Sequence, residues 1–168
     1  QFKSLSNTQL TALTTDAVAK LTAAKVNQLT SAQIKSLTTT QVAALSTNVT
    51  ASLTTTSLAA LSTSQISVLA TSVLANLNTA QTTALTSAQV KALSSNSFTS
   101  LTTTQLQALT TTQLQSVDIE DLNALSTAQV QLISTSQVQA LSVTQLAGLS
   151  TAALSAMTTA QVSSFKDA

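Results

Sequence analysis

The sequence contains no cysteine, histidine, tryptophan, tyrosine or proline, and its single glycine is Gly148. Without cysteine or histidine, the chain lacks the ligands of a structural zinc site, a thiol nucleophile and an imidazole base. Charged residues make up only 7% of the chain, and six basic residues nearly balance five acidic ones. Charge this sparse forms no basic patch that could bind nucleic acid or an anionic membrane, so we predict neither partner.

Long hydrophobic runs are also absent. The apolar residues come singly or in short groups, far below the roughly 18 residues that span a bilayer, so we predict no membrane insertion. The chain starts at Gln1 without an initiator methionine or an apolar leader, and we expect a fragment of a longer repeat array. A hydrophobic content of 43% over 168 residues nevertheless permits an ordered core.

An eight-residue repeat, here called the octad, runs through the whole chain. Every eighth residue from Leu5 onward is apolar in all twenty-one cases, and we call these the anchor positions. Every eighth residue from Phe2 onward is apolar in nineteen of twenty-one cases, with Thr50 and Thr82 as exceptions. We call these the staple positions. A repeat without insertions predicts one continuous solenoid over residues 1–168 with no internal domain boundary.

The residue after each anchor predicts how an octad folds. It is Ser or Thr in seventeen of twenty-one octads, Asn78 or Asp118 in two, and Ala70 or Lys166 in the others. Such short polar side chains are preferred at helix N-caps. Gln stands three residues later in twelve of twenty octads, which completes a capping box, while anchor and staple residues have the spacing of a hydrophobic staple. Each octad therefore predicts one capped helix of about six residues and one corner.

Every third octad differs from its neighbours. The third helical residue is not Gln in a series spaced by 24 residues: Lys25, Val49, Val73, Ser97 and Asp121. Because so short a helix is unstable alone, we predict an all-α solenoid with three helices in each 24-residue turn and Leu, Val and Ile on its axis. A β-solenoid is the alternative, since Thr and Val suit strands. Anchor and staple residues lie five apart, however, and would face opposite sides of a strand.

The densest charge lies at Asp118, Glu120 and Asp121, and carboxylates are ligands that Ca²⁺ accepts. The pattern favours a structural explanation over a metal site. Asp118 falls at an N-cap position, and the other two fall in a first helical turn, where negative charge complements the helix dipole. We therefore predict no metal-binding residue.

The other candidates for chemistry also have structural explanations. We expect Lys20, Lys25 and Lys35 on solvated faces, and Met157 in the core because it occupies an anchor position. Hydroxyl runs such as residues 102–104 have no base beside them to activate a nucleophile. We therefore predict no enzyme, no catalytic or cofactor-binding residue, and no cofactor.

The octads "LTSAQVKALS" (residues 85–94) and "LSTAQVQLISTSQVQALS" (residues 125–142) resemble a known repeat. It is the Leu-Thr-Thr-x-Gln-Val-x-Ala-Leu repeat of very large bacterial exported proteins, often labelled haem-utilisation or adhesion proteins. The likeness covers the whole chain and implies an extracellular or cell-surface location. It does not imply haem binding by this segment, because Met157 is the only candidate axial ligand and a poor one.

We therefore expect a structural spacer or stalk module of a large bacterial surface or secreted protein. The alternative is a binding or adhesion module that presents a repetitive Ser/Thr/Gln face to glycans, ice or another copy of itself. The expected partners are the neighbouring repeats of the parent chain. Because the ends of a solenoid are apolar unless capped, end-to-end self-association is a further expectation.

Overall fold

The structure is a computed structural model that describes residues 2–165, and every regular element in this range is helical. A short 3₁₀ helix, η1 (Phe2–Ser4), precedes twenty α-helices of four to six residues. These helices are α1 (Asn7–Thr11), α2 (Thr15–Ala19), α3 (Ala23–Val26), α4 (Ser31–Ser36), α5 (Thr39–Ala43), α6 (Thr47–Ala51), α7 (Thr55–Ala59), α8 (Thr63–Ser67), α9 (Thr71–Ala75), α10 (Thr79–Ala84), α11 (Ser87–Lys91), α12 (Ser95–Thr99), α13 (Thr103–Ala108), α14 (Thr111–Gln115), α15 (Ile119–Asn123), α16 (Thr127–Leu132), α17 (Thr135–Gln139), α18 (Val143–Gly148), α19 (Thr151–Ala156) and α20 (Thr159–Ser164).

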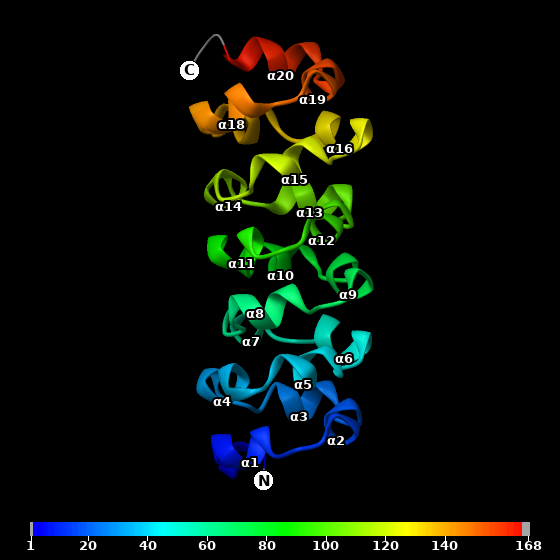
Figure 1. Cartoon of the computed structure of the whole chain (residues 1–168), viewed down its shortest axis with the longest axis vertical. Coiled ribbons are helices and arrows are strands. Elements are labelled where there is room, and N and C mark those ends of the chain that lie inside the picture. The colour runs from blue at the N-terminus through cyan, green and yellow to red at the C-terminus, as the bar shows by residue number, and fades with distance from the viewer. Residues whose placement is uncertain (1, 166–168) are drawn as a thin grey trace.

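The helices stack with a period of three. Helix α1 packs against α4, α2 against α5 and α3 against α6, and this pairing continues to α17 with α20, except that the main contact of α15 in the following turn is with α19. Three helices thus form one 24-residue turn, and the turns pile up along the long axis of the molecule (Figure 1). The described residues contain no strand. The predicted all-α solenoid is confirmed, and the β-solenoid alternative is excluded.

The predicted N-caps start the helices. Each of the twenty α-helices begins directly after the residue that follows an anchor, and in seventeen of them the cap side chain accepts from the amide of the third helical residue. Three caps lack this bond, namely Thr22, Ala70 and Asp118. Asp118 therefore occupies the predicted cap position without capping. The predicted exception Lys166 lies outside the described residues.

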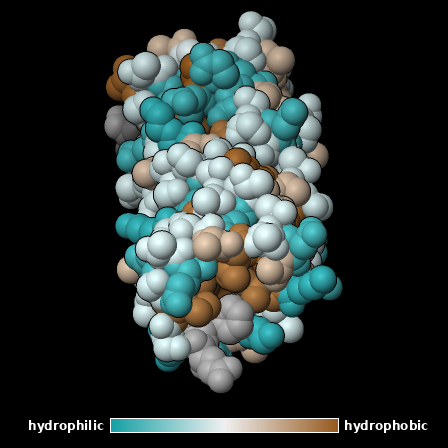
Figure 2. All heavy atoms as spheres, turned by 60° about the horizontal axis from the view of Figure 1, so that its bottom comes forward, coloured by the Kyte–Doolittle hydropathy of each residue, from teal (hydrophilic) through white to brown (hydrophobic). Residues whose placement is uncertain are grey.

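The anchor and staple residues form one apolar core along the axis. Anchors from Leu21 to Leu141 are 2% to 9% exposed, and the staple residues from Leu10 to Val138 are 0% to 4% exposed. Leu58, Ile66 and Phe98, for example, have no exposed surface. Outside this core the side surface is mainly hydrophilic or neutral, whereas hydrophobic side chains gather at the N-terminal end of the stack (Figure 2).

The two polar residues at staple positions are also buried. Thr50 is 1% exposed and Thr82 is fully buried. Their hydroxyls donate to the carbonyls four residues earlier in the same helix, Ser46 at 3.1 Å and Asn78 at 3.0 Å. Because each hydroxyl is satisfied within its own helix, the polar atom adds no unpaired group to the core and the methyl group packs there.

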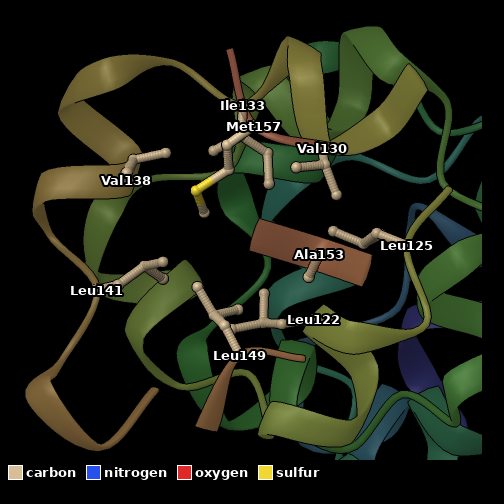
Figure 3. Close-up of a pocket in the computed structure, with 9 residues that line it drawn as sticks. All are labelled: Leu122, Leu125, Val130, Ile133, Val138, Leu141, Leu149, Ala153 and Met157. Carbon is tan, nitrogen blue, oxygen red and sulfur yellow. The ribbon is translucent and has the colours of Figure 1, made fainter. Parts of the chain in front are cut away.

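The apolar core contains a gap near its C-terminal end. A small cavity of about 20 Å³ is lined by the apolar side chains of Leu122, Leu125, Val130, Ile133, Val138, Leu141, Leu149, Ala153 and Met157 (Figure 3). Met157 is half-buried, and its sulfur lies beside this space, so its predicted core position is confirmed. Such a lining provides no polar partners to hold a water molecule.

Gly148 lies where a side chain would collide with a neighbour, and its backbone conformation is one that any residue can adopt. Its φ angle is not positive, but a Cβ atom built on it would lie 2.7 Å from Cγ1 of Ile119. Ile119 is the first residue of α15, a position that holds Thr in thirteen of twenty octads. The larger Ile side chain therefore fills the volume that an alanine at position 148 would need.

This contact yields a paired prediction. Gly148→Ala alone should lower the free energy of unfolding by about 1 to 3 kcal/mol through overpacking, as measured by urea denaturation. With Ile119→Thr in the same chain, Gly148→Ala should instead raise it by about 0.5 to 1 kcal/mol, because alanine favours a helix over glycine. Equal effects in both backgrounds would contradict the assigned contact.

Candidate functional site

The acidic stretch does not converge on one point. Asp118 accepts no amide of its own helix but pairs with Lys91, whose Nζ lies 3.2 Å from Oδ1 of Asp118. Both side chains are more than half exposed, so the pair contributes little to stability. Glu120 is exposed, while Asp121 is buried at the third helical position. Among residues 2–165, no group of three His, Cys, Asp or Glu residues is placed to hold a metal ion.

The predicted lysine faces and hydroxyl runs lie where expected. Lys20, Lys25 and Lys35 are exposed on three different segments. In the hydroxyl run 102–104, Thr102 caps α13 through its bond to the amide of Gln105. No helix in the described part of the chain is long and apolar enough to cross a bilayer.

The most regular polar feature is a set of glutamines between successive turns. Twelve capping boxes form as predicted, each with the Gln oxygen accepting from the amide of its own N-cap residue. In eleven of these boxes the Gln nitrogen also donates to carbonyls of the preceding turn, 28 to 31 residues earlier. The eleven are Gln33, Gln41, Gln65, Gln81, Gln89, Gln105, Gln113, Gln129, Gln137, Gln145 and Gln161.

Gln105 shows the geometry of these links. Its Oε1 accepts from the amide of Thr102 at 2.8 Å, while its Nε2 donates to the carbonyls of Leu74 at 2.8 Å and Leu77 at 2.7 Å. The Leu74 carbonyl also accepts from the Leu77 amide, whereas the Leu77 carbonyl accepts from no backbone amide. The Gln105 side chain is 3% exposed. One buried amide therefore caps a helix, satisfies a corner carbonyl and links two turns.

The link between turns is missing from the sequence prediction, although the sequence carries a signal for it. A capping box is served equally well by Glu, whose carboxylate can accept from the cap amide. In this chain the third helical residue is Gln in twelve octads and Glu in none. Only the amide carries two donor hydrogens, so the consistent choice of Gln indicates a second set of acceptors.

In two of the octads that lack this Gln, an asparagine in the preceding turn accepts from the cap amide instead. Ser57 replaces Gln in α7, and the N-cap Thr54 has no Gln oxygen to accept from its amide. Asn27, thirty residues before Ser57, accepts from the Thr54 amide through Oδ1 at 3.0 Å and donates through Nδ2 to the Ser52 carbonyl at 2.8 Å. The two turns are still linked, but the linking side chain comes from the earlier turn, whereas each linking glutamine comes from the later one.

The same replacement occurs a second time. Ala153 stands in place of Gln in α19, and Asn123, again thirty residues earlier, accepts from the Ser150 amide at 2.8 Å and donates to the Gly148 carbonyl at 3.0 Å. In the same column of octads, the residues thirty positions before Gln33, Gln81, Gln105 and Gln129 are Lys3, Ala51, Ala75 and Thr99. Asparagine thus occurs at this position only where the Gln is missing.

The glutamine link can be tested within one helix. Gln105→Ala should lower the free energy of unfolding by about 2 to 4 kcal/mol, because it leaves the Thr102 amide and a corner carbonyl without partners. Gln107→Ala, at an exposed position of the same helix, should change it by less than about 0.5 kcal/mol. Urea denaturation followed by circular dichroism compares the two, and similar losses would argue against the link.

The replacement of Gln by Asn predicts a rescue. Asn27→Ala should cost about 1 kcal/mol, since it removes two exposed hydrogen bonds. Adding Ser57→Gln should recover most of that loss, because a glutamine there can accept from the Thr54 amide. Asn96→Ala, an exposed position in α12, serves as the control and should be neutral. A double variant as unstable as Asn27→Ala alone would contradict the equivalence.

Comparison with known proteins identifies one repeat family. The model of the ALTTAQ repeat matches residues 118–151, which contain the helices α15 to α18. Within the match, residues 124–129 read "ALSTAQ", which contains the anchor Leu125, the cap Ser126 and the linking Gln129. Neither the curated proteins nor the solved structures that were searched gave a match. Over this stretch the chain is similar to ALTTAQ repeats, which supports its description as a repeat module.

Proposed function

We propose that this chain is a structural spacer, a repeat module that separates other parts of a large bacterial surface or exported protein. In this proposal it has no catalytic activity, and its partners are the neighbouring repeats of the parent chain. The surface or extracellular location rests on the sequence resemblance described above.

The buried glutamine links between turns are the observation that carries this proposal. Apolar contacts alone are non-directional, and stacked short helices held only by them would be free to slide. Each link instead joins a helix start to a defined corner 28 residues earlier. Because the links recur from Gln33 to Gln161, they hold register along nearly the whole described chain.

The shape of the molecule also suits a spacer. The two termini lie at opposite ends of the long axis (Figure 1), so whatever is joined to them is held apart by the full stack. The side surface carries mainly hydroxyl and amide groups with few charges. In a quasi-one-dimensional stack, length changes by whole turns while the local contacts remain the same.

A spacer should shorten by one turn when one turn is removed. Deleting residues 63–86 joins Ser62 to Ser87 and keeps a capping box, because Gln89 becomes the third helical residue after Ser62. Spin labels on Thr8→Cys and Ser155→Cys, both exposed, should come about 8 to 10 Å closer, one interaxial spacing. Pulsed electron resonance measures this distance.

The deletion experiment and two binding assays together distinguish the spacer from the binding module. An unchanged or very broad distance distribution after the deletion would contradict a rigid spacer. If glycan arrays or ice-recrystallisation assays gave a signal that was lost when the exposed Thr residues of one face were changed to Ala, the binding-module alternative would be favoured instead. The spacer proposal expects no signal in either assay.

A further inference from the structure

We propose that two copies of this chain pair side by side, in antiparallel orientation, along one edge of the solenoid. We call it the unlinked edge, and it contains the corners at Leu21, Leu45, Leu69, Leu93 and Val117. The contact uses the flank of the stack, away from both of its ends, and it does not depend on the spacer function.

The glutamine links leave this edge almost entirely free. Ten of the eleven linking glutamines close corners on the other two edges, and only Gln145 donates to a corner here, the carbonyl of Val117. Within residues 2–165, four corner peptide groups on this edge neither donate nor accept a hydrogen bond. They are the groups Leu21–Thr22, Leu45–Ser46, Leu69–Ala70 and Leu93–Ser94.

The middle of the unlinked edge is apolar as well as unpaired. Val68, directly before Leu69, is a large hydrophobic residue that is 39% exposed. Ala70, directly after it, is exposed and is the only one of the twenty N-cap residues within residues 2–165 that has an apolar side chain. Covering this spot buries apolar surface, which is favourable, but it also requires partners for the covered peptide group.

The two ends of the unlinked edge carry opposite charge. Lys20 and Lys25 are exposed on either side of its first corner, whereas Asp118 and Glu120 are exposed at the start of α15. Lys91, close to the acidic end, pairs with Asp118, and Glu120 forms no ion pair within residues 2–165. Antiparallel pairing brings the basic end of one copy to the acidic end of the other, while parallel pairing brings like charges together.

The spacing of the corners sets the register of the pair. Leu69 lies 48 residues from both Leu21 and Val117, so a two-fold axis at Leu69 places Lys20 of one copy beside Glu120 of the other. Each unpaired peptide group has one donor and one acceptor, and two such groups related by a two-fold axis can exchange both bonds, as in antiparallel strands. A second copy repeats these groups at the same spacing, which makes it the partner that fits.

Sedimentation velocity over a concentration series tests the pairing. The chain should pass from monomer to dimer and grow no further, because a contact between identical surfaces closes on itself. Val68→Glu should weaken dimerisation about tenfold or more, since it brings two like charges together at the axis. Leu132→Glu is the matched control: Leu132 also lies directly before an anchor and is 41% exposed, but on another edge, and the change should have no effect.

Three results would overturn the proposal: a monomer at all concentrations, growth beyond the dimer, or equal effects of Val68→Glu and Leu132→Glu. A further variant tests the backbone contact. Ser97→Gln should close the Ser94 amide and the Leu69 carbonyl within the chain, as Gln145 does for its own cap and corner. It should raise the midpoint of thermal unfolding and weaken the dimer, and an unchanged dimer affinity would refute pairing through the corner peptide groups.

A charge exchange tests the direction. Lys20→Glu should weaken the antiparallel dimer, because it places carboxylates of the two copies side by side. Adding Glu120→Lys to the same chain should restore the affinity by reversing both charges. In a parallel pair position 20 faces position 20, and Lys20→Glu would exchange one like pair for another. A Lys20→Glu variant that dimerises as well as the original chain would therefore refute the antiparallel arrangement.

Discussion

The structure depends on the side-chain amide of the glutamine at the third helical position. Its oxygen closes the start of one short helix, and its nitrogen closes a corner of the turn before, as Gln105 does with Thr102 and Leu77. Helices of four to six residues are too short to be stable by themselves. Both ends of these helices therefore need partners, and the amide provides one to each of two successive turns.

This use of one amide explains the choice of glutamine at the third helical position. Burying a polar group without partners is costly, yet ten of the eleven linking glutamines are buried, and no buried side-chain nitrogen or oxygen in the described residues lacks a partner. A charged residue in that place would lack either the donor or the acceptor. At the third helical position the chain consequently carries an amide in twelve octads and a charge in only two, Lys25 and Asp121.

Three of the departures from the octad occur in compensating pairs. Asn27 and Asn123 accept from the cap amides of the two octads in which Ser57 and Ala153 replace the glutamine. Gly148 leaves space for the side chain of Ile119. In each case one residue changes and another, 29 or 30 positions away in the adjacent turn, takes over its bond or its space. Such coupling between neighbouring turns is the behaviour of a quasi-one-dimensional stack.

The sequence by itself determined the helix starts, the anchor and staple positions, and the 24-residue turn, because caps and periodic apolar residues are local patterns that act within a few residues. Only the tertiary structure decided where the glutamine nitrogens bind and where asparagine replaces them. Those contacts join residues 28 to 31 positions apart. Their partners are backbone carbonyls, which every residue possesses, so no residue type marks them until the turns are stacked.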